Sequence, residues 1–160
     1  MPSHSSLSSV GLAVLLTIGA GLPDLRPPFQ VTATIDLMSM TEIRGGNNGH
    51  FVVNADINNQ SIVVLVDTGA STVALSYQDA DRAGLHPANL TFDVPVNTAN
   101  GQTKAARVKI SKIVIDSVRV DDVDAMVLPD GALKGTLLGM SFLSRLSSFK
   151  SENGTLTLKN

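Results

Sequence analysis

The feature that most constrains this chain is a run of aliphatic residues that ends in a carboxylate. Ile62–Val66 contains five aliphatic residues, four of them β-branched, and Asp67-Thr68-Gly69-Ala70-Ser71 follows at once. Such a run is typical of a strand that is covered on both faces, so the strand is expected to deliver Asp67 to the edge of a hydrophobic core. Because Gly69 has no Cβ, the backbone can fold back toward the carboxylate and point amide N–H groups at its oxygens. Asp67 is therefore the first candidate functional residue.

Composition narrows the class of protein. A length of 160 residues with 43% hydrophobic content is enough for one domain with one core. The net charge is −2, from 12 basic and 14 acidic residues, and this balance provides no positive field for a nucleic-acid backbone. The chain has no cysteine, which excludes disulfides, a thiol nucleophile and a thiolate metal site. The three histidines, His4, His50 and His86, are scattered, and none has a metal ligand four residues later. We expect no metal, no cofactor and no nucleic-acid partner.

The N-terminus carries an apolar segment, Val10–Leu22. Its length matches the hydrophobic region of a signal peptide better than a full membrane span. The first basic residue is Arg26, so the usual positive residues before the segment are missing and charge does not define its orientation. We expect residues 1–22 to be an export signal or an uncleaved membrane anchor, with the domain on the periplasmic side in a bacterium. An apolar N-terminal strand or a misassigned start codon is the alternative.

A linker is expected over residues 23–48. Pro23, Pro27 and Pro28 cannot continue a helix, and the segment ends in the glycine-rich run Gly45–Gly49. Alternating apolar residues in Phe29–Leu37 favour a short strand inside the linker. We therefore expect the folded domain to occupy residues 49–160.

Short strands separated by turns dominate the rest of the chain. In Phe51–Ile57 apolar and polar residues alternate, as in a half-buried strand, and Asn58-Asn59-Gln60 supplies turn residues for a hairpin. This pattern predicts an all-β barrel or sandwich. The other expected strands are Thr72–Ser76, Val94–Val96, Lys104–Ile110, Ile113–Ile115, Val118–Val120 and Val123–Val127; a helical turn is expected at Tyr77–Ala83, one short helix at Ser141–Leu146, and a last hairpin around Asn153-Gly154.

Three ordered motifs resemble a known family. Asp67-Thr68-Gly69-Ala70 after an apolar strand resembles the active-site loop of the aspartic proteases, and Ala70 is more similar to the retropepsin branch than to pepsin. Leu137-Leu138-Gly139, 70 positions after Asp67, resembles the segment that packs beneath that loop. Ala99-Asn100-Gly101 resembles the tip of the flap hairpin. Residues 49–160 look most like the bacterial retropepsin-like family of membrane-anchored clan AA proteases.

The resemblance implies a retropepsin-like closed β-barrel or sandwich and an aspartic endopeptidase that acts on a peptide or protein. Hydrolysis by carboxylates needs one group as a base that activates water and one as an acid that protonates the substrate. Two carboxyls that share one proton supply both, as in pepsin. The chain carries one such motif, so the second carboxyl is expected to be Asp67 of another copy, in a homodimer with two-fold symmetry.

The residues around Asp67 have implied supporting roles. The Thr68 hydroxyl would reach across the axis to the partner's backbone, although a locally satisfied hydroxyl at a strand end is an alternative. Ala70 replaces a Ser that bonds the carboxylate in pepsin-like loops, which predicts a working pH less acid than that of pepsin. Gly139 would allow close packing beneath the loop, with Leu137 and Leu138 in the core. Met140 stands where retroviral enzymes have an arginine that braces the dimer.

Several alternatives remain open from the sequence. The fold could serve as a catalytically silent dimerisation or binding module. Asn100-Gly101 alone is an ordinary hairpin signal, and Asp130-Gly131 is expected to be a turn. The matches to glycosylation sites at Asn59, Asn89 and Asn153 are assigned no function. The expected walls of a substrate pocket are Ala99, Val66 and Leu138.

Overall fold

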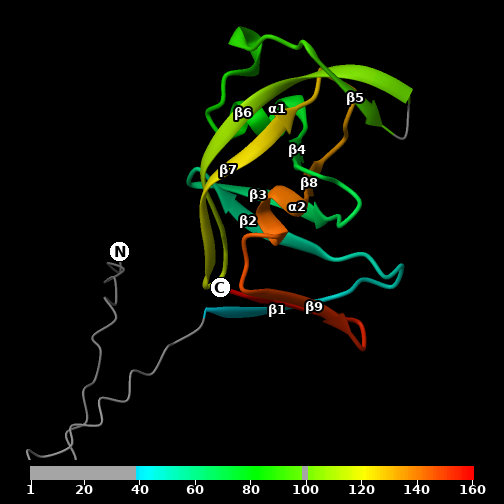
Figure 1. Cartoon of the computed structure of the whole chain (residues 1–160), viewed down its shortest axis with the longest axis vertical. Helices are drawn as coiled ribbons and strands as arrows, with labels where there is room; N and C mark the ends of the chain where they lie inside the picture. Colours follow the sequence, from blue (N-terminus) through cyan, green and yellow to red (C-terminus); the bar gives the residue numbers. More distant parts are fainter. Residues whose placement is uncertain (1–38, 99–100) are drawn as a thin grey trace, which may run out of the picture. The chain divides into compact units, whose positions relative to one another are not determined.

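The structure is a computed structural model that describes residues 39–98 and 101–160, and strands make up most of this part of the chain (Figure 1). The predicted all-β class is confirmed, with two short α-helices in place of one. The strands are β1 (Met40–Arg44), β2 (Val52–Ile57), β3 (Gln60–Val66), β4 (Val73–Leu75), β5 (Val94–Thr98), β6 (Gly101–Ile115), β7 (Val118–Val127), β8 (Thr136–Leu138), β9 (Ser148–Glu152) and β10 (Thr155–Lys159); the helices are α1 (Tyr77–Arg82), the 3-10 helix η1 (Pro87–Asn89) and α2 (Met140–Leu143).

Six strands close into a barrel, in the order β2-β3-β8-β4-β7-β6, with β6 returning to pair with β2. β5 lies outside this ring and pairs only with the first part of β6. Closure leaves the six strands without a free edge. Aliphatic side chains of the strands fill the interior together with residues of α2. The large, fully buried side chains include Ile57, Ile62, Leu75, Ile110, Ile113, Ile115, Leu138, Phe142 and Leu143.

Asparagine and glycine form the tight hairpin turns that the sequence predicts. Asn58 and Asn59, between β2 and β3, have φ values of 52° and 70°. Asn153 and Gly154, between β9 and β10, have φ values of 49° and 73°. Two-residue turns of this kind need positive φ at both positions, which asparagine and glycine tolerate better than other residues.

Two long strands replace the series of short ones that the sequence predicts between residues 104 and 127. β6 and β7 pair along most of their length and are joined at Asp116, which has a φ of 50°. The prediction of two separate strands, Val118–Val120 and Val123–Val127, with a turn between them is wrong. β7 stays paired with β6 across Asp121 and Asp122, and only the Ser111–Asp122 pair is missing from the ladder. Asp122 has a φ of 52°, so the strand is distorted at this residue without changing partners.

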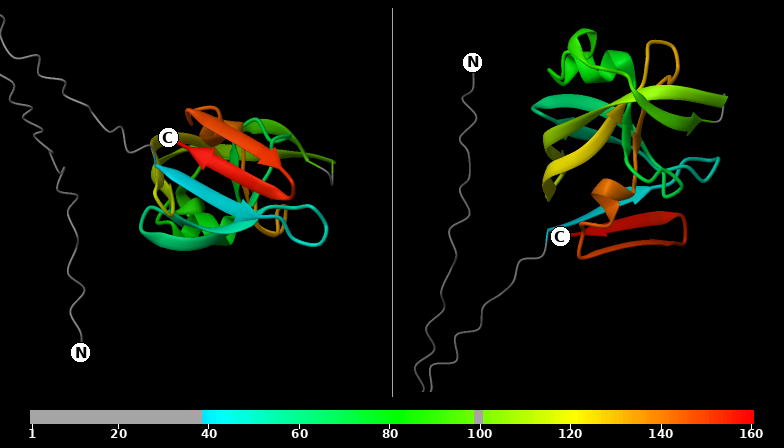
Figure 2. Two further views of the ribbon diagram at one scale, coloured as in Figure 1. Left: turned by 90° about the horizontal axis from the view of Figure 1, so that it is seen from below. Right: turned by 45° about the horizontal axis from the view of Figure 1, so that its top comes forward.

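The predicted linker 23–48 also needs correction, because β1 belongs to the folded unit. Thr41 and Ile43 are buried while Met40, Glu42 and Arg44 are exposed, and the strand pairs with β10. β1, β10 and β9 form a three-stranded sheet that lies against the barrel as a second layer (Figure 2). A five-residue alternation next to a glycine run is too short to be recognised without its partner strand.

Residues 1–38 lie outside the described part of the chain, and with them the expected signal or anchor segment and the short strand in Phe29–Leu37. Over residues 39–98 and 101–160, no helix has both the length and the hydrophobicity needed to cross a bilayer.

Both helices are short. α1 begins after Ser76, whose Oγ accepts a hydrogen bond from the Asp79 N–H at 3.1 Å, and Gly84 follows its end with a φ of 72°. This agrees with the helical turn predicted at Tyr77–Ala83. α2 starts one residue earlier than the predicted helix Ser141–Leu146, with Gly139 as its N-cap, and it ends at Leu143.

Candidate active site

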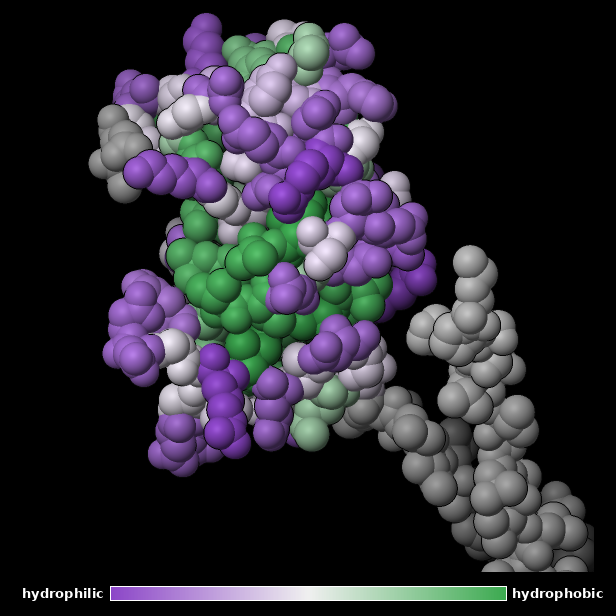
Figure 3. All heavy atoms as spheres, turned by 180° about the vertical axis from the view of Figure 1, so that it is seen from behind, coloured by the Kyte–Doolittle hydropathy of each residue, from purple (hydrophilic) through white to green (hydrophobic). Residues whose placement is uncertain are grey.

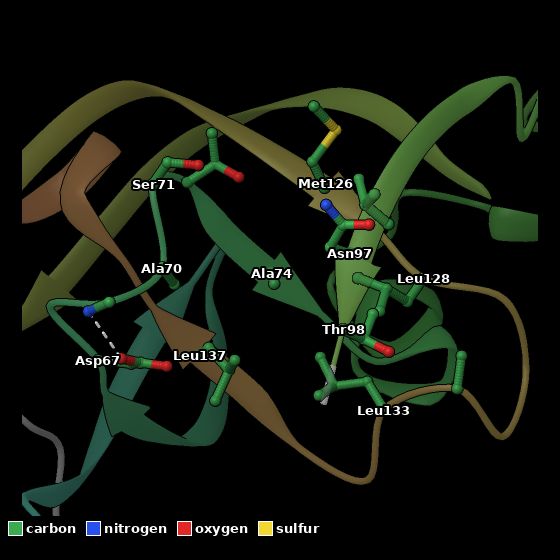
Figure 4. Close-up of a pocket in the computed structure, with 14 residues that line it drawn as sticks. Asp67, Ala70, Ser71, Ala74, Asn97, Thr98, Met126, Leu128, Leu133 and Leu137 are labelled. Carbon is green, nitrogen blue, oxygen red and sulfur yellow. Dashed lines mark hydrogen bonds between the residues drawn. The ribbon is translucent and has the colours of Figure 1, made fainter. Parts of the chain in front are cut away.

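Asp67 is the first residue after β3, and its backbone is still tied to the neighbouring strand. The Asp67 N–H donates to the Leu138 carbonyl at 3.1 Å, which extends the parallel pairing of β3 with β8 by one residue. The chain then turns sharply: the Gly69 N–H donates to Oδ1 of Asp67 at 2.8 Å (dashed line in Figure 4), and the Ala70 N–H lies 3.3 Å from the Asp67 carbonyl. The turn therefore holds the half-buried carboxylate in one orientation.

Gly139 packs directly beneath this loop. A Cβ at this position would lie 2.2 Å from the carbonyl oxygen of Thr72 and 2.7 Å from that of Ala70. The next residue, Met140, donates its N–H to the Ala70 carbonyl at 2.8 Å. Because the opposing atoms are backbone, no side chain can be accommodated without moving the loop that carries Asp67.

Ser141 links the same region to β7, the strand that pairs with β4. Its Oγ accepts a hydrogen bond from the Val73 N–H at 2.9 Å and donates to the Asp124 carbonyl at 2.7 Å. The hydroxyl therefore connects the start of β4, just after the active loop, to β7. The role of Ser141 was not predicted from the sequence, in which its position two residues after Gly139 is the only indication.

A cavity of about 390 Å³ opens beside the Asp67 carboxylate (Figure 4). Asp67 is the only acidic residue among the described residues that line it. Most of the other walls are small or apolar side chains and carry no charge. They are Gly69, Ala70, Ser71, Thr72, Ala74, Val96, Asn97, Thr98, Met126, Leu128, Ala132, Leu133 and Leu137.

Two expectations about the walls are wrong. Leu138 is fully buried in the core and not a pocket wall, whereas Leu137, which was expected to be core, is half-buried and lines the cavity. The reason is the alternation of β8, in which successive side chains point to opposite faces. Of the other two expected walls, Val66 does not line this cavity and Ala99 lies outside the described residues.

The β5–β6 hairpin provides another wall, through Val96, Asn97 and Thr98. Thr98 pairs with Gly101, as expected for the arms of a hairpin. Of the three residues predicted for its tip, Ala99 and Asn100 lie outside the described residues, and Gly101 is the exposed first residue of β6.

A second cavity, of about 420 Å³, lies next to the same carboxylate. It shares Asp67 with the first cavity and includes Thr68, which is exposed. Val66 lines this cavity together with Gly49, His50, Phe51, Phe149, Ser151 and Leu156. Asp67 therefore stands between two hollows, one facing β5 and one facing the three-stranded sheet.

Comparison with known proteins identifies the family. The family model described as "gag-polyprotein putative aspartyl protease" matches residues 53–145, which include Asp67 and the segment that packs beneath it. The chain belongs to the retropepsin-like aspartic protease family. The crystal structure of a retropepsin-like aspartic protease from Rickettsia conorii has a TM-score of 0.69 to this retropepsin-like chain, with 34% identity, and covers 76% of this chain and 91% of its own.

Other relatives are more distant or less well described. The EIAV protease in complex with the inhibitor HBY-793 has a TM-score of 0.50 at 18% identity, over 63% of this chain and 91% of its own, which supports the fold alone. An uncharacterized protein from the cobV 5′ region of a Sinorhizobium species is 45% identical over 113 residues, 71% of this chain and 48% of its own. An uncharacterized protein of Rickettsia prowazekii is 37% identical over 116 residues, 72% of this chain and 49% of its own. This retropepsin-like chain thus spans about half the length of these two relatives.

Proposed function

We propose that the chain is an aspartic endopeptidase in which two copies each contribute one Asp67 to a shared active site. The observation that carries this proposal is the placement of one carboxylate, oriented by the Gly69 N–H, at the wall of a cavity with no other acid among its described lining residues. The family of the chain supports the same chemistry.

The chemistry requires a second carboxyl. One ionised Asp67 takes a proton from water, which attacks the carbonyl carbon of the scissile peptide, while the protonated partner Asp67 donates to the carbonyl oxygen. The proton taken from water then passes to the leaving nitrogen as the C–N bond breaks, and a hydroxyl of the tetrahedral intermediate returns a proton to the partner's carboxylate. Two carboxyls at close range share one proton because both cannot ionise together.

The surface beside Asp67 favours completion by a second copy. Thr68 is exposed and borders the second cavity, so the residue next to the carboxylate is accessible to a partner. We propose that the Thr68 hydroxyl bonds the partner's backbone across a two-fold axis. A catalytically silent dimerisation module would use the same surface, but no observation favours it over the enzyme.

We further propose that residues 1–22 direct export or anchor the chain in a membrane, with the protease domain on the periplasmic side in a bacterium. The apolar run Val10–Leu22 supports this proposal. Fractionation of cells that express the full chain, with and without residues 1–22, tests it; recovery of both forms in the same soluble fraction contradicts it.

Subunit mixing tests the shared active site. Wild-type chain and an Asp67→Asn chain are unfolded together and refolded at equal concentrations, and casein digestion is measured per wild-type chain. Random pairing leaves about a quarter of the dimers with two Asp67 residues, so activity per wild-type chain falls to about half. An Asp130→Asn chain in place of the Asp67→Asn chain is the control: it keeps Asp67, so every dimer is active and activity per wild-type chain rises to about twice that of wild type alone. Undiminished activity with the Asp67→Asn chain would show that one copy is sufficient.

A further inference from the structure

A row of apolar side chains crosses the outer face of the barrel, from the cavity to the β2–β3 hairpin. The row is defined by register: Val52 lies opposite Leu65, Leu65 opposite Leu137, Leu137 opposite Ala74, and Ala74 opposite Met126. Residues directly opposite each other on paired strands point to the same face. These five residues, here called the apolar row, therefore form one surface that spans β2, β3, β8, β4 and β7.

The pattern of burial confirms that this surface faces outward. Residues adjacent to the row in sequence, Val64, Leu138 and Val73, are fully buried. The row residues are half-buried or exposed, with Val52 53% exposed. Val63 lies on the same face as Leu65, two residues earlier in β3, and is 57% exposed. Hydrophobic residues gather in the middle of one face of the domain, between hydrophilic residues above and below (Figure 3).

The row is continuous with the candidate active site. Leu137, Ala74 and Met126 line the cavity beside Asp67. Leu65 and Val52 continue the row beyond the cavity, one and two strands further on. Two strand spacings are about 10 Å, which an extended peptide covers in about three residues. A polypeptide with one side chain in the cavity can therefore reach Val52.

We infer that Val52, Val63 and Leu65 form an accessory binding surface for an apolar residue of the substrate, located about three residues from the side chain that occupies the cavity. This inference rests on the proposed peptidase function. It adds a specificity determinant outside the cavity: among substrates with the same residue in the cavity, those with a second apolar residue at this distance bind more tightly.

The extent of the patch favours a peptide segment over a second copy of the chain. On the same face, Asn54 lies opposite Val63, and Asp56 lies opposite Ser61, so the apolar surface ends there. A stable dimer contact buries about 800 Å² on each partner. The two exposed valines and the half-buried Leu65 offer far less than this, but enough for one or two apolar side chains.

The experiment uses the full chain and a set of peptides. Casein is digested, one cleaved bond is identified by mass spectrometry, and decapeptides around it are made with Leu or Asp at each position two to four residues from the bond on either side. Wild type is compared with the double variant Val52→Thr/Val63→Thr, which keeps β-branched shape and strand preference. Met40→Thr is the matched control, since Met40 is 50% exposed on β1, outside the row.

We expect wild type and Met40→Thr to favour Leu over Asp at one of these positions by about fivefold in KM with kcat unchanged. The double variant is expected to lose this preference. A peptide that is too short to reach the patch is expected to be cleaved equally well by the double variant and by wild type.

No preference in wild type, or a preference that survives in the double variant, overturns the inference but leaves the proposed function intact. A lower solution mass of the double variant would instead assign the patch to contact between copies. Equal cleavage by wild type and Asp67→Asn would remove the proposed function, and the inference with it.

Discussion

Two loops among the described residues place an aspartate near a glycine at the end of an apolar strand, and only one of the two aspartates borders a cavity. Asp67 follows β3 and Asp130 lies shortly after the end of β7. Asp130 is exposed, and its Oδ1 accepts a hydrogen bond from the Gln78 side chain at 2.6 Å. Asp67 is half-buried and borders both cavities, whereas Asp130 borders neither.

The difference comes from what lies beneath each loop. Under the Asp67 loop, Gly139 approaches the backbone so closely that a Cβ would overlap Thr72, and Met140 and Ser141 add hydrogen bonds. Within the Asp130 turn, a Cβ on Gly131 would have no atom within 4 Å, and the Ala132 N–H donates to the Pro129 carbonyl of the same turn at 3.0 Å. In this chain the aspartate that borders the two cavities is therefore the one whose loop packs on a second segment.

The largest expected difference between the loops is catalytic. Asp67→Asn is expected to lower kcat for casein-derived peptides by about 10⁴-fold, because a carboxamide can neither take nor donate the proton. Asp130→Asn is expected to leave kcat unchanged. Peptide cleavage is measured by mass spectrometry, with far-UV circular dichroism to check that both variants fold. Similar losses in the two variants would contradict the comparison.

The two glycines should differ in stability. Gly139→Ala forces a Cβ against the backbone of Thr72, and we expect a loss of about 3 kcal/mol or more in the free energy of unfolding. Gly131→Ala meets open space but must hold a φ of 75°, which is expected to cost about 1 kcal/mol. Urea unfolding of both variants measures the difference. A milder effect at Gly139 than at Gly131 would show that the active loop is not tightly supported.

Removal of the Ser141 hydroxyl is expected to have a smaller effect on the free energy of unfolding. Ser141→Ala leaves the Val73 N–H and the Asp124 carbonyl without their side-chain partner, and we expect a loss of about 1–3 kcal/mol in unfolding free energy, together with a lower kcat. Ser144→Ala is the control: its Oγ donates to the Met140 carbonyl on the exposed side of α2, and we expect a change within about 0.5 kcal/mol. Equal effects would mean that Ser141 does not position the loop.

The smallest expected effect on stability concerns Asp124, an exposed acid that borders neither cavity. The pKa of the Asp124 carboxyl is lowered, chiefly by the hydrogen bond from Lys109 Nζ at 2.9 Å. A folded-state pKa below the unfolded value stabilises the fold above the unfolded pKa, and this contribution disappears as the pH falls through the folded pKa. Lys109→Met should therefore slightly reduce stability at neutral pH and leave it unchanged in strong acid. Urea midpoints at several pH values check this; a uniform shift at all pH values would contradict it.

Part of this structure could be predicted from interactions between residues that are close together in the sequence. The strand before Asp67, the tight turn at Gly69 and the asparagine hairpins each depend on residues that are neighbours in sequence, so their side chains and φ preferences predicted them. The requirement for a glycine at position 139 was also predictable, but only through the resemblance of its segment to a known family.

The sequence by itself determined which residues of each strand share a face, because side chains alternate along a strand. Only the tertiary structure decided which strands become neighbours. Because of this strand order, β1 pairs with β10 and Leu137 lines the cavity. Ser141 forms hydrogen bonds with residues of both β4 and β7, and Val52, Leu65 and Leu137 lie opposite one another on neighbouring strands. Each of these contacts joins residues that are distant along the chain, and their energies come from packing and hydrogen bonds that exist only after the barrel has closed.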